Sequence, residues 1–169
     1  MRDILQNEIL ARINVKRVLR YALYMFLALI TQTMLFTQLR IGGVCPMVLP
    51  AVAIAVGMFE GATWGAVFSL IMGIFTDMAF VETTVLFTLL LPALAFASGF
   101  VSQFFINRRF FAFMGAAVIG LLLTGVVQML HTAAGDSFSG VMLRVVLLQT
   151  LLSIPFAALA YPAPAKWIE

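Results

Sequence analysis

The sequence predicts an all-α integral membrane protein, a bundle of about six transmembrane helices with short loops. The first observation is composition: of 169 residues, 63% are hydrophobic and 10% are charged, whereas soluble domains average about 45–50% apolar and 25% charged residues. The second is length, because each spanning helix needs roughly 20 apolar residues, which leaves room for about six spans and little else. The composition excludes a soluble enzyme, a DNA-binding domain and a disordered tail.

Six apolar stretches, separated by short turns, define the expected elements. The first, residues 18–37, follows a basic arm at residues 1–17 and is too long for the apolar part of a signal peptide, so we expect it to remain as a span. The second, residues 44–59, is short and contains Pro46 near its first turn and Pro50 deeper, so we expect a kink at these prolines. The other spans are expected at residues 62–81, 85–106, 110–131 and 141–161, before a tail at residues 162–169.

The basic residues are unevenly distributed, and this asymmetry predicts the topology. If the N-terminus is cytoplasmic, only Arg40 and Arg144 lie on the outer side, which is the bias of the positive-inside rule. Both termini are then cytoplasmic. If the short second stretch is re-entrant, the turn at residues 107–109 moves outside and this topology fails. The basic residues expected on the cytoplasmic side are Arg2, Arg12, Lys16, Arg17, Arg20, Arg108, Arg109 and Lys166.

Small residues recur every four positions before and along the third stretch. Such a ridge lets two helix backbones approach closely in lipid, so it predicts a helix-packing seam or a groove for a partner helix. The ridge consists of Gly57, Gly61, Gly65, Ser69 and Gly73, and it ends at Asp77. A similar series in the fifth stretch is Ala112, Ala116, Gly120, Thr124 and Gln128.

Asp77 is the most costly residue of the predicted spans, because a carboxylate within a bilayer needs a partner or water. Arg144 lies at a similar depth from the outer end of the sixth stretch, so one hypothesis is an intramembrane ion pair between Asp77 and Arg144. The alternative is that both side chains reach the outer headgroups.

The sequence offers few residues for catalysis or metal binding. Cys45 is the only cysteine and His131 the only histidine, and no metalloprotease, phosphate-loop or dinucleotide motif is present. We therefore expect no enzyme activity, metal or cofactor. A two-carboxylate peptidase site at Asp77 and Asp136 is an alternative, but the signature expected around the second aspartate in such peptidases is absent.

A longer pattern links the prolines to the ridge. Its parts are Pro46-Met-Val-Leu-Pro50, Met58-Phe59-Glu60-Gly61, Gly65-Ala66-Val67-Phe68 and Gly73-Ile74-Phe75-Thr76-Asp77. The pattern resembles the rod shape-determining protein MreD family, which has a proline-bearing helix, an acidic-Gly turn and a glycine-spaced helix ending in G-x-x-x-D. The resemblance covers roughly residues 46–100. The sequence departs from it after Asp77, where the family often has a glycine-containing turn.

The resemblance implies a non-catalytic scaffold subunit of the cell-elongation machinery in the bacterial plasma membrane. Its partners would be membrane lipid, a bitopic MreC-like protein, a RodA-like polymerase with its transpeptidase, and an MreB-like actin. Neither nucleic acid nor a small-molecule substrate is expected. The family's motif residues here are Gly61, Gly65, Gly73 and Asp77, with an architectural role. The alternative is a substrate-binding subunit of an energy-coupling-factor vitamin transporter, with a polar outer pocket built from Asp77, His131, Asp136 and Arg144.

Overall fold

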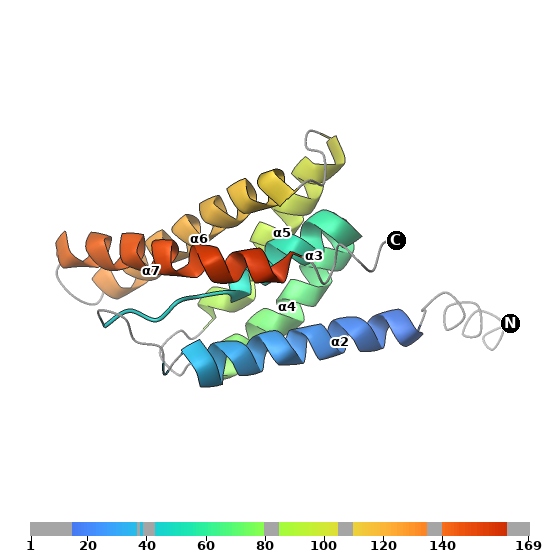
Figure 1. The fold of residues 1–169 in the computed structure, drawn as a ribbon, viewed down its shortest axis with the longest axis horizontal. Helices are drawn as coiled ribbons and strands as arrows, with labels where there is room; N and C mark the ends of the chain where they lie inside the picture. Colours follow the sequence, from blue (N-terminus) through green and yellow to red (C-terminus); the bar gives the residue numbers. More distant parts are fainter. Residues whose placement is uncertain are drawn as a thin grey trace, which may run out of the picture.

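The computed structural model describes residues 15–36, 38, 43–79, 85–104, 110–134 and 140–161, and it confirms the predicted all-α membrane bundle. Helix α2 continues into a π-helical segment, η1, and the later helices pack around α3 (Figure 1). The elements are α2 (Val15–Ile30), η1 (Thr31–Phe36), α3 (Leu49–Glu60), α4 (Ala62–Ala79), α5 (Leu86–Phe104), α6 (Phe110–Ala133) and α7 (Gly140–Ala160).

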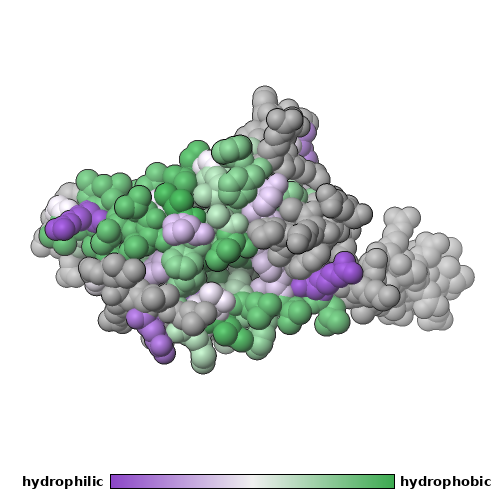
Figure 2. Space-filling view, viewed as in Figure 1, coloured by the Kyte–Doolittle hydropathy of each residue, from purple (hydrophilic) through white to green (hydrophobic). Residues whose placement is uncertain are grey.

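Helices α4, α5, α6 and α7 are each long and apolar enough to cross a membrane. Their boundaries lie within about two residues of the predicted stretches, as expected for helix ends. Figure 2 shows hydrophobic side chains over much of the visible face, with the strongly hydrophilic residues mainly toward its periphery. Such a surface fits a hydrocarbon environment, because large apolar side chains on the outside of the bundle are exposed only to lipid there.

Helix α3 is the centre of the bundle. Every residue from Leu49 to Phe59 is buried, and α3 contacts α2, α4, α5, α6 and α7. Its 12 residues extend about 18 Å, less than the roughly 30 Å of a bilayer's hydrocarbon core. The helix therefore does not cross a bilayer alone. A helix that is apolar on all sides and buried in this way is a core element.

The predicted kink at Pro46 and Pro50 is wrong. Pro46 belongs to the non-helical residues 45–48 that lead into α3, and Pro50 lies in the first turn of the helix. Proline is tolerated in a first turn because the N–H that it lacks has no partner within the helix. The prolines inside helices are Pro92 in α5 and Pro155 in α7.

Side chains from two other helices satisfy the non-helical backbone before α3. The Gln32 amide in η1 donates to the carbonyl of Pro46 (3.1 Å) and accepts from the N–H of Val48 (2.9 Å). The N–H of Met47 donates to the Ser153 hydroxyl of α7 (2.7 Å). Irregular backbone at membrane depth needs such protein partners, since lipid supplies none. We call Gln32 and Ser153 the backbone clasp.

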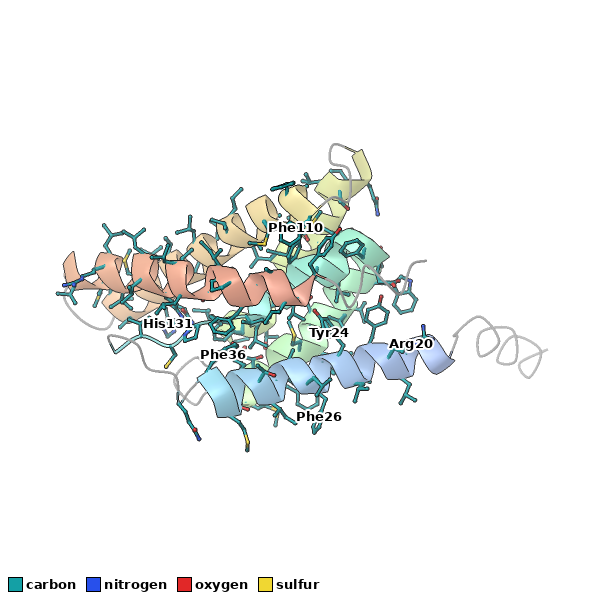
Figure 3. All side chains as sticks on the ribbon, viewed as in Figure 1. Arg20, Tyr24, Phe26, Phe36, Phe110 and His131 are labelled. Atoms are coloured by element: carbon teal, nitrogen blue, oxygen red, sulfur yellow. The ribbon has the colours of Figure 1, made fainter. Side chains whose placement is uncertain are left out.

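Hydrogen bonds place the start of α2 and the ends of α3 and α7 together. The Tyr21 hydroxyl of α2 donates to the Glu60 carboxylate, and the Tyr24 hydroxyl donates to the carbonyl of Ala160 at 2.8 Å. The chain thus returns, through residues 44–60, to the end of the bundle where α2 begins. Figure 3 shows Arg20 and Tyr24 toward this end and His131 toward the opposite one.

Replacing Gln32 by Ala should destabilise the fold, because the carbonyl of Pro46 and the N–H of Val48 would lose their side-chain partner. We expect a loss of about 1–3 kcal/mol, the cost of leaving buried polar groups unsatisfied, measured as a lower midpoint of thermal unfolding in detergent. Gln38→Ala is the control, since Gln38 is exposed. Equal midpoints for the two variants would show that the clasp does not hold this segment.

Candidate functional site

The predicted glycine ridge is divided between two helices. Gly57 lies near the end of α3, Gly61 lies between the helices with φ of 96°, and the later members belong to α4. A positive φ favours glycine because a Cβ atom would be strained there. Gly61 therefore lets the chain turn sharply, and the ridge residues before and after it face one another rather than lying on one helix.

Gly57 and Gly65 allow backbone contact among three helices. A Cβ atom on Gly65 would lie 2.4 Å from the Cα atom of Gly57, and one on Gly57 would lie 2.2 Å from the carbonyl oxygen of Ala95. Real Cβ atoms do not approach so closely. Helices α3, α4 and α5 therefore meet where only hydrogen atoms fit between the backbones, as small-residue seams in membranes allow.

Helix α5 packs against the part of the ridge near the C-terminal end of α4. A Cβ atom on Gly73 would lie 2.6 Å from the carbonyl oxygen of Phe87 and 2.8 Å from the Cα atom of Thr88. Ser69 and Thr76 on the same side of α4 are fully buried. The ridge is therefore a helix-packing seam within the chain, and α5 occupies the place that a partner helix would take.

Asp77 caps α5. Its carboxylate accepts hydrogen bonds from the N–H of Phe87 (3.1 Å), the N–H of Thr88 (2.7 Å) and the hydroxyl of Thr88 (2.7 Å). Helix α5 begins at Leu86, so these N–H groups belong to its first turn and have no acceptor within the helix. A carboxylate is also favourable there because the helix dipole is positive at this end. One acid thereby ties the end of α4 to the start of α5.

The predicted ion pair between Asp77 and Arg144 does not form. Both are among the described residues, and the oxygens of Asp77 are directed to α5, whereas Arg144 is an exposed residue of α7. The nearby first turn of α5 supplies donors whose position the α4–α5 packing already fixes. The pair was inferred from matched depth alone, and depth does not reveal on which side of a bundle a residue lies.

Only some members of the small-residue series in α6 lie at a contact between helices. A Cβ atom on Gly120 would lie 2.3 Å from the Ile54 Cδ1 atom of α3. Thr124 is fully buried, and its hydroxyl donates to the carbonyl of Gly120 at 2.7 Å. Ala112, Ala116 and Gln128 are only partly buried. The buried face of α6 is therefore rotated from the predicted series and also includes Phe113, Ala117 and Leu121.

No sequence pattern predicted the aromatic cluster at the end of the bundle where α2 begins. The Tyr161 ring packs against Phe59 (5.5 Å between ring centroids), Phe110 (5.2 Å) and Phe113 (5.5 Å). Edge and tilted contacts of this kind stabilise aromatic pairs beyond simple burial. The cluster joins the ends of α3 and α7 to the start of α6. Aromatic residues near three predicted span ends were the only hint.

Among the described residues, no hydrogen bond or ion pair joins Asp77, His131 and Arg144, three of the polar residues proposed for an outer ligand pocket. Asp77 caps α5, His131 is exposed at the end of α6, and Arg144 is exposed on α7. Asp136 lies outside the described residues. Within the described ranges, no group of three His, Cys, Asp or Glu residues could hold a metal ion.

The structure describes only some of the predicted cytoplasmic basic residues. Arg20 is exposed on α2. Lys16 and Arg17 belong to α2, although their side chains are not among those described. Arg12, Arg108 and Arg109 lie outside the described residues. The orientation of the bundle in a membrane therefore stays a prediction from the sequence.

The fold and the seam define a helical membrane protein. Its short helix α3 is buried, and the hairpin of α4 and α5, capped by Asp77, packs against it. Comparison of the chain with known proteins gives no matching family model, no significant match to a curated protein and none to a solved structure.

Replacing Gly73 by Ala should separate α4 from α5, because the new methyl group would meet the backbone of Phe87 and Thr88, which cannot rotate away. We expect a loss of about 1–3 kcal/mol, typical of overpacking, seen as a lower unfolding midpoint in detergent. Gly115→Ala is the matched control, since it is also a helical glycine but a Cβ atom there has nothing within 4 Å. An unchanged midpoint for Gly73→Ala would contradict the seam.

Replacing Asp77 by Ala should loosen the start of α5, because two N–H groups and the Thr88 hydroxyl lose their acceptor. We expect a loss of about 1–3 kcal/mol in stability and faster hydrogen exchange at Phe87 and Thr88, measured by mass spectrometry. Thr88→Val removes one of the three bonds and should cost less. If exchange in α5 is the same in Asp77→Ala as in the wild type, Asp77 does not cap this helix.

Proposed function

We propose that this chain is a non-catalytic scaffold subunit of the bacterial cell-elongation complex, similar to MreD. It would lie in the plasma membrane with a cytoplasmic N-terminus and contact an MreC-like bitopic protein. The same complex would hold a RodA-like polymerase with its transpeptidase, and an MreB-like actin. The proposal rests on the resemblance in residues 46–100 and on what those residues do in the fold.

The observation that carries the proposal is the use of the motif residues. Gly61 turns the chain between two helices, Gly65 and Gly73 bring backbones into contact, and Asp77 caps α5. Each of these roles is architectural, which is the role that the resemblance implies. A motif that builds a rigid three-helix unit suits a subunit that holds other membrane proteins in place.

The outer faces of the bundle leave room for partners within the membrane. On α4, the side opposite the seam exposes Trp64 and Met78, which are 64% and 75% exposed. On α2, Phe26 points away from the bundle (Figure 3) and is 59% exposed. Because α4 is locked to α5 on its other side, an attached helix would meet a surface of fixed shape.

Depletion of the protein in the bacterium that encodes it tests the proposal. We expect depleted cells to lose their rod shape and become round, since the elongation complex would lose its membrane subunit. Wild type and Gly115→Ala should restore rods, whereas Gly73→Leu, which disrupts the seam, should not. The measurement is the ratio of cell length to width, and purification from the same cells should recover a single-span coiled-coil protein.

Two results would overturn the scaffold role. One is normal cell shape in cells from which the protein has been depleted, as verified by immunoblotting. The other is a vitamin that co-purifies with the protein and raises its unfolding temperature, which would favour the transporter subunit instead. Expression of each variant must match that of the wild type for the comparison to hold.

A further inference from the structure

A shallow hollow of about 530 Å³ lies on the outside of α7. The described residues that line it form one continuous face of that helix: Gly140, Leu143, Arg144, Leu147, Leu148 and Leu151. The residues of α7 that pack into the bundle, among them Val146, Thr150 and Ser153, lie on a different face. The hollow therefore opens away from the core, toward the surroundings of the bundle.

Among the described residues that line the hollow, Arg144 is the one that carries a charge. Its side chain is exposed and has no hydrogen bond or ion pair with any described residue. It lies four residues after α7 begins at Gly140, about 6 Å along the helix axis. At that depth an arginine side chain can reach the level of the lipid headgroups, with its apolar stem against the helix.

The apolar part of the hollow continues from Arg144 toward the middle of the helix. Leu147, Leu148 and Leu151 follow at helical spacing, and Leu151 is about 10 Å from Arg144 along the axis. A guanidinium group at one end of a shallow hollow lined by leucines matches a molecule with an anionic head and an apolar chain. Arginine binds phosphate groups through two parallel hydrogen bonds, because its planar guanidinium group matches their geometry.

We propose that this hollow binds an anionic phospholipid, with its phosphate at Arg144 and an acyl chain along Leu147, Leu148 and Leu151. The composition of the face favours a lipid over a partner helix. Helix seams in membranes are rich in small residues, because burial of leucine gains nothing when lipid tails are equally apolar. Among the described lining residues only Gly140 is small, and it lies at the start of α7. The inference is independent of the scaffold role.

Lipid retention by the purified full-length protein tests the proposal. The protein is mixed in detergent with dioleoylphosphatidylglycerol, and bound lipid is counted by native mass spectrometry. We expect the wild type to retain this lipid and Arg144→Gln to retain at least fivefold less. Arg20→Gln removes the same charge from an exposed site on α2 and should behave as the wild type. Dioleoylphosphatidylcholine, which has no net charge, should be retained less than the anionic lipid.

A second pair of variants tests the part of the hollow proposed to hold the acyl chain. Leu151→Trp places a bulky ring in the hollow and should reduce retention, whereas Leu159→Trp alters an equally exposed leucine of α7 outside the lining and should not. The unfolding midpoint of each variant establishes that it remains folded. We expect all of them to fold, because the substituted positions are exposed.

Three results would each overturn the proposal. One is equal retention of the anionic lipid by Arg144→Gln and wild type; if Arg144→Gln then also fails to recover a single-span protein, the hollow binds a helix instead. The second is equal retention of the two lipids. The third is an Arg144-dependent stabilisation by inorganic phosphate as large as that by the anionic lipid, which would indicate a site for free anions.

Discussion

The complete burial of α3 is the constraint on which the rest of the bundle depends. A helix of 12 residues with no exposed side from Leu49 to Phe59 must be enclosed by other helices on every side. Those helices can approach closely only where side chains are small, which is why Gly57, Gly65 and Gly120 lie at the contacts. The short helix also leaves non-helical backbone within the bundle, and lipid cannot hydrogen-bond to it. Gln32 and Ser153 meet that need from η1 and α7.

Asp77 shows how a costly residue becomes useful in such a bundle. A carboxylate within a span is tolerated when donors surround it, and the first turn of a helix offers free N–H groups at no further cost. By capping α5, Asp77 joins the two helices that the Gly73 contact already brings together. The same carboxylate thus gains hydrogen-bond partners within the bundle and holds α4 and α5 together as a hairpin.

The sequence predicts the structure correctly where the prediction concerns a single helix. Long apolar runs bounded by polar turns predicted α4 through α7 closely, because hydrocarbon forces such runs into helices. The prediction is wrong where it depends on how two helices are oriented relative to each other, as with Asp77 and Arg144. It is also wrong at Pro50, because a helix that begins within an apolar stretch has no polar residue to mark its start. The Tyr161 cluster was also not predicted, since its members lie at the ends of three separate helices, with Tyr161 directly after α7.

The sequence by itself determined that this chain is a helical membrane protein and that small residues lead to Asp77, because hydropathy and four-residue spacing are properties of a segment. Only the tertiary structure decided what lies against that ridge. The seam contains α5 of the same chain, Asp77 caps that helix, and α3 is a buried core element. These outcomes depend on which helices are neighbours, and in lipid that choice is made by shape and hydrogen bonding across the bundle rather than by hydrophobicity along the chain.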